Sequence, residues 1–252
     1  MNDHALGMIR FTLGLSVMLA LGCTKSAPAP VEPAAETTPD YPPKKPLTPK
    51  ELFPHVRIDK YQRVVEIDGT VPIDTHDPRA PTVFLETICC TSDTREHESL
   101  VVTSAKPSHL HTALLLLAFE PGSPGRFQWN DDQMTVVPPM GDGVRVTLVT
   151  RDQDGNEIEH DPSSWIVSAD TGERFEGEWV FAGSRMVEHE GAEFYDADGA
   201  GVVVGLHSFG SEVIALRDMI SPEADVEAPV WIANGAAIPE VGTPVVIRFS
   251  VR

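Results

Sequence analysis

The chain of 252 residues carries 38 acidic and 19 basic side chains, which gives a formal net charge of −19 at pH 7. Binding to nucleic acid, or to an anionic membrane through the protein surface, requires clustered lysine and arginine, so this charge argues against both. From about residue 50 onward the chain is long enough for one domain with a substantial hydrophobic core.

Residues 1–22 have the features of a bacterial export signal. Arg10 precedes an apolar run over residues 11–21, which is shorter than a membrane-spanning helix requires. The run ends in Ala-Leu-Gly-Cys, which resembles the lipobox of bacterial lipoproteins with its alanine and leucine reversed. We therefore predict a lipoprotein signal peptide, acylation of Cys23 and attachment to the lipid bilayer through that cysteine.

Two further residues of the leader refine this prediction. Thr24, and not an aspartate, follows the cysteine, which resembles lipoproteins that are sorted to the outer membrane. We therefore expect an outer-membrane location facing the periplasm. The acidic Asp3 is unusual in such a leader, and it leaves both Met1 and Met8 open as the start of translation.

Residues 23–49 are rich in proline and alanine and predict a flexible tether. Such a segment cannot bury enough apolar surface to offset its chain entropy. The globular domain is then expected over residues 50–252, opened by a short helical turn through Phe53, because residues 48–51 carry a capping-box pattern.

One helix dominates the prediction for the globular domain. Pro107 suits a first helical turn, and the leucine-rich segment that follows predicts a buried helix over residues 107–119, ended by Pro121 and Gly122. Short β-like runs occur at residues 64–67, 82–88, 98–102, 144–150, 165–168, 178–181, 201–206, 213–216 and 244–251. We therefore predict an α+β domain with a largely antiparallel sheet packed on this single helix.

Ionisable side chains gather just before and at the start of this helix. His97, Glu98, His109 and His111 are residue types that bind zinc, although the two histidines of the helix do not share a face and His97 and Glu98 alternate on a strand. A divalent metal site therefore remains a hypothesis. The second hypothesis is an anion or small-ligand site at the free N–H groups of the helix start, and its residues are Arg95, His97, Glu98, Lys106, Ser108, His109 and His111.

Cys89 and Cys90 are neighbours at the end of a predicted strand. They leave open a strained disulfide, a metal site, or one buried and one exposed thiol, of which the last is expected.

The acidic run at residues 196–199 resembles the beginning of a calcium-binding loop. It lacks the later ligands of such a loop, so a turn is expected there.

Several segments in order resemble the YdjY-domain family of bacterial envelope proteins. They are REHESLV at residues 95–101, KPSHLHTALLLL at 106–117, WVFAGS at 179–184, the run at 195–199 with the following GVVVGL, and GTPVVIRF near the end. The resemblance implies that these segments form one domain, and it implies no activity or catalytic residues.

Two functions follow from these observations. The favoured one is a non-enzymatic binding or structural module, held at the membrane and facing the periplasm, with an unidentified protein or small-ligand partner and no cofactor. The alternative is a metal-binding protein or metal-dependent hydrolase that uses His97, Glu98, His109 and His111.

Overall fold

The computed structural model describes residues 46–77, 79–130 and 133–252. These residues belong to one compact unit, Lys45–Arg252. The predicted leader, Cys23 and the tether through Lys45 lie outside the described residues. Within the described ranges, every helix is too short or too polar to cross a membrane.

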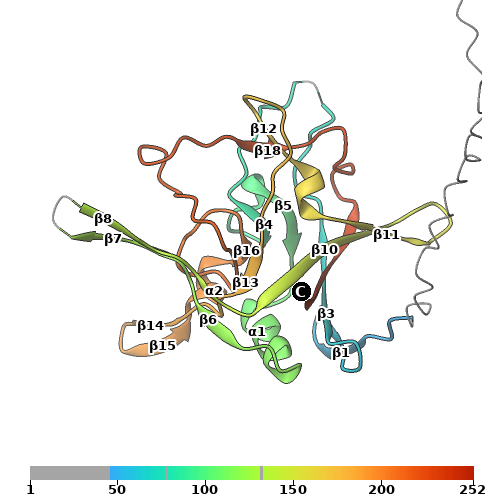
Figure 1. The fold of residues 1–252 in the computed structure, drawn as a ribbon. Coiled ribbons are helices and arrows are strands. Elements are labelled where there is room, and N and C mark those ends of the chain that lie inside the picture. The colour runs from blue at the N-terminus through green and yellow to red at the C-terminus, as the bar shows by residue number, and fades with distance from the viewer. Residues whose placement is uncertain (1–45, 78, 131–132) are drawn as a thin grey trace, which may run out of the picture. The chain divides into compact units, whose positions relative to one another are not determined.

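The described residues fold mainly as strands, with 42% in strands and 11% helical. Eight strands follow one another around a closed barrel, in the order β3, β19, β10, β13, β17, β16, β4 and β5, and β5 returns to pair with β3 (Figure 1). Their bounds are β3 (Val64–Thr70), β4 (Thr87–Thr91), β5 (Ser99–Thr103), β10 (Gly143–Arg151), β13 (Trp179–Phe181), β16 (Val202–Gly205), β17 (Ile214–Leu216) and β19 (Pro244–Val251).

The remaining elements decorate this barrel. Three further strands extend its sheet: β1 (Lys50–Phe53), β2 (Val56–Asp59) and β11 (Glu157–His160). Four small pairs lie outside it: β6 (Pro121–Ser123) with β9 (Met140–Gly141), β7 (Arg126–Asn130) with β8 (Gln133–Val137), β12 (Ile166–Ser168) with β18 (Trp231–Ala233), and β14 (Met186–His189) with β15 (Ala192–Tyr195). The helical elements are η1 (Glu96–Glu98), α1 (Pro107–Leu116), η2 (Pro162–Trp165) and α2 (Asp196–Ala200).

The predicted fold class is therefore wrong. The domain is a closed, mostly β barrel and not an α+β sheet packed on a helix. The barrel closes because Gly69 and Thr70 of β3 pair with Val102 and Thr103 of β5. Sequence patterning marks individual strands but carries no signal for this closing pair, because a strand looks the same in an open sheet and in a barrel.

The barrel is filled mainly by strand side chains, and α1 adds to this core from one end. Fully buried residues such as Ile67, Leu100, Leu148 and Phe249 belong to one continuous apolar cluster. In Figure 1 α1 is drawn below the barrel strands, and it packs against β2, β3 and α2. An eight-stranded barrel is just wide enough for its own side chains to fill it, which leaves no room for a central helix.

Helix α1 is shorter and more exposed than the leucine run predicts. Leu110 and Leu114 are buried, but Leu115 and Leu116 are 45% and 57% exposed. The helix ends at Leu116 because Ala118 adopts a left-handed conformation, with φ of 57°.

The chain reversal after α1 is fixed by an arginine from β2–β3. Arg63 donates from Nε to the Leu117 carbonyl at 2.8 Å and from Nη2 to the Ala118 carbonyl at 2.7 Å. Its guanidinium also lies over the Phe119 ring. Leu117 and Phe119 are thereby buried after the helix has ended, which is why a run of apolar residues suggested a longer helix.

Most predicted strands are confirmed, but several local predictions are wrong. The run at 82–88 overlaps β4 only at its last two residues, and His97 and Glu98 lie on η1 and not on a strand. The last strand, residues 244–251, has the predicted bounds, and the run at 144–150 is β10 with one more residue at each end. Residues 50–53 form strand β1 and not a helical turn. The acidic run at 196–199 lies in helix α2, which Gly201 ends in the left-handed conformation.

Candidate functional site

A cavity of about 500 Å³ opens beside α1, where three distant segments meet. The segments are the middle of α1, the turn that follows β13, and the end of β15. The cavity is lined by Ser108, His111, Thr112, Gly183, Ser184, Arg185, Met186 and Tyr195. We refer to it as the α1 pocket.

His111 and Tyr195 form the polar centre of the α1 pocket. The Tyr195 hydroxyl donates to the Gly183 carbonyl at 3.0 Å, and it lies 2.9 Å from Nδ1 of His111. Since the tyrosine proton is committed to Gly183, the histidine Nδ1 must carry the proton of this second contact. The Nε2 atom of His111 is then the acceptor of the ring.

The turn after β13 is built in an unusual backbone conformation. Gly183 and Ser184 both have positive φ, 80° and 53°. Their N–H groups donate to the carbonyls of Val213 and Glu212, and these bonds hold the turn against the barrel. A serine with a left-handed backbone conformation is uncommon. Backbone strain of this kind persists where the surrounding structure fixes it, often at functional sites.

The Ser184 side chain is used within the same network. Its Oγ accepts from the Ala197 N–H at 3.1 Å, and its hydroxyl hydrogen bonds Tyr195. No described contact joins Ser184 to His111, so the histidine is not placed as a base for a serine nucleophile.

Both titratable groups of this network are held neutral. Burial lowers the pKa of His111, although a hydrogen bond to the Gly183 carbonyl opposes the shift. Burial raises the pKa of Tyr195 well above its ordinary value; the Ser184 hydrogen bond opposes this and the nearby charge of Asp198 adds to it. The centre of the pocket therefore presents an uncharged imidazole and an uncharged phenol at neutral pH.

The start of α1, predicted as an anion site, already binds an anion of its own chain. The Ser108 N–H and hydroxyl donate to the two carboxylate oxygens of Asp198 at 2.8 and 2.7 Å. Lys106, the residue before the helix, is exposed and makes no side-chain cap. An external anion would have to displace Asp198.

The rim of the α1 pocket combines an ion pair with an apolar side chain. Arg185 donates from Nε to Asp196 at 2.7 Å and is 57% exposed, so the cation in the lining is largely neutralised. Met186 next to it is 58% exposed. The pocket therefore offers an imidazole acceptor, guanidinium donors, hydroxyls and an apolar wall, with no net positive charge.

The structure places the predicted site residues apart from one another. His109 stacks on Phe53 with ring centroids 4.4 Å apart, whereas His111 lies in the α1 pocket. His97 lies on η1 with its side chain 73% exposed. In the described ranges no group of three or more His, Cys, Asp or Glu side chains is placed to hold a metal ion, so the metal hypothesis gains no support.

Arg95 and Glu98 belong to a separate polar cluster that the sequence did not reveal. Arg95 binds Glu86 at 2.8 Å, and its guanidinium lies 4.2 Å from the centre of the Phe209 ring. Burial, followed by the hydrogen bond and charge of Glu98, raises the pKa of Glu86. This cluster supports the loop after β16, since Leu206 and His207 both donate to the Glu86 carbonyl.

The prediction that one of the paired cysteines is exposed is wrong. Cys89 and Cys90 are both free and fully buried on β4, which lies between β5 and β16. Burial raises the pKa of the Cys89 thiol well above its ordinary value. Neither thiol is accessible for the redox chemistry that a surface cysteine performs.

Sequence reasoning missed Gly183, Ser184, Arg185 and Tyr195 as parts of a site. Each lies in or next to a segment that carries the family resemblance, but no motif of known chemistry marks them. Tyr195 is 84 residues from His111, and only the closed barrel brings the two together.

The fold and the pocket define a closed barrel of mostly short strands with a ligand-sized cavity at one end. The YdjY domain family matches residues 56–250. The chain therefore belongs to the YdjY domain family, and the resemblance seen in the sequence is confirmed. No curated protein and no solved structure matches the chain.

Proposed function

We propose that this protein is a lipid-anchored, non-enzymatic binding module of the bacterial envelope that faces the periplasm. Its α1 pocket is the proposed ligand-binding site. The leader and the lipobox-like residues before Cys23 support the anchor, and the Pro-rich tether supports a domain held away from the bilayer. Thr24 after the cysteine supports an outer-membrane location.

The observation that carries the binding role is the hydrogen-bond network of His111, Tyr195 and Ser184. Every hydroxyl proton in it is committed inside the network, which leaves no activated nucleophile, and His111 Nε2 is the acceptor left for a ligand. A site of this kind orients a bound molecule through fixed polar groups rather than transforming it.

The ligand that fits this lining is a neutral molecule with several hydroxyl groups, such as a sugar unit. Such a ligand donates to His111 Nε2 and accepts from Arg185, while its apolar face contacts Met186. Anionic ligands are disfavoured, because Asp196 and Asp198 lie beside the pocket and the chain carries a net charge of −19.

Titration of the full chain in detergent with glucose, N-acetylglucosamine and inorganic sulfate tests this ligand class. We expect saccharide binding that His111→Gln weakens roughly tenfold, since one hydrogen bond to the ligand is lost. His97→Gln changes an exposed histidine outside the pocket and serves as the matched control. Sulfate binding without saccharide binding, or equal effects of the two substitutions, contradicts the proposal.

Metabolic labelling with radioactive palmitate tests the anchor. The wild-type chain should incorporate the label and fractionate with membranes, and Cys23→Ala should do neither. An unlabelled wild-type protein contradicts the lipoprotein assignment but leaves the pocket untouched.

A further inference from the structure

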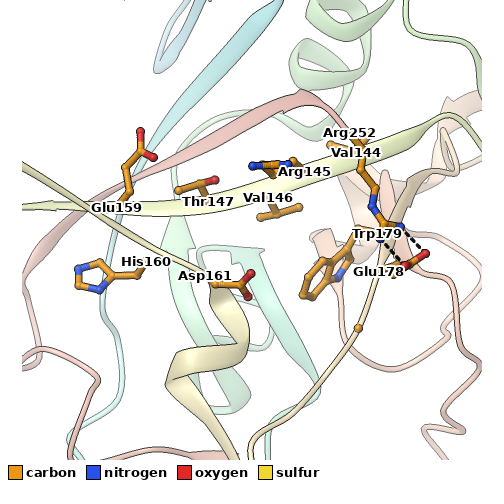
Figure 2. A pocket seen from close by; sticks show the side chains of 11 residues that line it. Val144, Arg145, Val146, Thr147, Glu159, His160, Asp161, Glu178, Trp179 and Arg252 are labelled. Atoms are coloured by element: carbon orange, nitrogen blue, oxygen red, sulfur yellow. Dashed lines mark hydrogen bonds and ion pairs between the residues drawn. The ribbon is translucent and has the colours of Figure 1, made fainter. Parts of the chain in front are cut away.

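The wall of the barrel is interrupted along one edge of β10. On this edge β13 pairs with Gly143 and Val144, and β11 pairs from Leu148 onward. Between them the three residues 145–147 have no strand partner on this edge in the described structure, although their other edge pairs with β19. Figure 2 shows this gap below β10, between Asp161 on one side and Glu178 and Trp179 on the other.

The backbone of Val146 faces into this gap. Along an antiparallel strand the N–H and C=O groups of alternate residues point to the same side. Asp142 accepts from the Phe181 N–H at 2.8 Å across this edge, so the even-numbered residues of β10 face it. Val146 thus presents an N–H and a C=O to the gap, although its side chain is buried.

The gap contains a cavity of about 490 Å³. Its lining consists of the open edge of β10 and the two chain segments that leave it. The residues are Val144, Arg145, Val146, Thr147, Glu159, His160, Asp161, Gly177, Glu178, Trp179 and Arg252. We refer to this cavity as the β10 slot.

Charges in the β10 slot are separated along its length. Acidic Glu159 and Asp161 lie at the β11 end, whereas Arg145 and Arg252 lie at the β13 end (Figure 2). Glu159 is already paired with Arg248, and Arg252 with Glu178. Asp161 accepts from the Ser163 N–H through Oδ1. Neither Asp161 nor Arg145 makes an ion pair among the described residues, so one negative and one positive charge remain for a ligand.

The direction of this charge separation matches an antiparallel strand. A chain that continued from β11 toward β13 would run opposite to β10, with its amino end near Asp161 and its carboxyl end near Arg145. Three residues of β10 are open, and a strand advances about 3.4 Å per residue, so three ligand residues span the opening.

We propose that the β10 slot binds a tripeptide with free ends, which completes the barrel wall as a short antiparallel strand. Its ammonium group pairs with Asp161 and its carboxylate with Arg145. Its central residue exchanges both backbone hydrogen bonds with Val146. This inference is independent of the α1 pocket, because the two sites share no lining residue.

Isothermal titration of the full chain in detergent with trialanine tests this inference. Trialanine should bind; acetylation of its amine or amidation of its carboxylate should each weaken binding roughly tenfold, because each removes a charge-assisted contact. N-methylation of the central residue should weaken it at least as much, since that residue can no longer donate to Val146.

Substitution of the charged residues completes the test. Arg145→Gln should weaken free trialanine roughly tenfold but leave the affinity of the amidated peptide unchanged, since that peptide lacks the carboxylate. Arg126→Gln, an exposed arginine on β7, is the matched control. Absence of binding, equal affinity of free and blocked peptides, or equal effects of the two arginine substitutions overturns the proposal.

Discussion

The barrel has a long-stranded side and a short-stranded side. Strands β3, β19 and β10 run for 7, 8 and 9 residues, whereas β13, β17 and β16 have 3, 3 and 4. Both cavities lie where the short strands meet the rest of the fold: the α1 pocket follows β13, and the β10 slot lies where β13 leaves β10. The long side therefore forms the continuous part of the barrel wall, and both cavities lie on the short side.

The two sides also differ in how completely a buried ionisable side chain is paired. On the long side Arg248 binds Glu66, Glu157 and Glu159, so its charge is fully compensated. On the short side Glu212 accepts from the N–H groups of Phe209 and Gly210 through one oxygen only. Its other oxygen is buried without a partner among the described residues. A complete network stabilises at all moderate pH values, whereas an incomplete one makes stability depend on protonation.

Removal of Arg248 should produce the largest effect. Burial alone would lower the pKa of this guanidinium, but its hydrogen bonds to Glu157 and Glu66 raise it. Arg248→Ala leaves Glu66 buried without its closest cation, and we expect a loss of about 3–5 kcal/mol in the free energy of unfolding. Urea denaturation measures this loss.

The matched control for Arg248 is Arg151→Ala. Arg151 pairs with Glu157 at the exposed end of β10, and its removal should cost about 1 kcal/mol or less. Comparable losses for the two substitutions would contradict the distinction between a compensated core charge and a surface pair.

A pair of leucine substitutions tests whether α1 is buried on one face only. Leu114 is fully buried against the long side, and Leu114→Ala should cost about 2–5 kcal/mol. Leu116 is 57% exposed, and Leu116→Ala should change stability by less than about 0.5 kcal/mol. Thermal denaturation compares the stabilities of the two variants. Equal losses of stability would indicate a helix that is buried on all sides.

The pH dependence of stability tests Glu212. Burial raises its pKa to about 7 from an ordinary 4.5, so the folded state holds a proton that the unfolded state releases. Between these two values stability falls as pH rises, by about 3 kcal/mol at most. We expect Glu212→Gln to match the wild type near pH 4.5 and to be more stable by roughly 2 kcal/mol at pH 8.

The control for this prediction is Glu188→Gln on the exposed hairpin strand β14. It should leave the pH profile of the wild type unchanged. If Glu212→Gln also retains the wild-type slope between pH 5 and 8, the buried carboxyl is not the cause of that slope.

Local structure could be predicted from the sequence where one segment decides it. The alternating apolar pattern of residues 244–251 is sufficient to define β19, because both periodicity and β-branched residues agree. The leucine run failed as evidence for helix length, since Ala118 reverses the chain and Phe119 is buried by Arg63 from elsewhere. That contact spans more than fifty residues and leaves no local signal.

The sites were predictable only in part, for the same reason. Ser108 and His111 were candidates because they lie at a helix start, but their partners Asp198 and Tyr195 lie 90 and 84 residues further along the chain. The β10 slot arises from a missing pair along one strand edge. A gap of this kind depends on where β11 ends and β13 begins, which strand propensity does not specify to within one residue.

Hydrogen exchange along β10 tests the interrupted wall most directly. The amides of Val144 and Leu148 pair with β13 and β11, while that of Val146 faces the slot between them. We predict that the Val146 amide exchanges orders of magnitude faster than those of Val144 and Leu148 in the free protein, because it has no hydrogen-bond acceptor among the described residues. Equal protection of all three amides in the free protein would contradict the account.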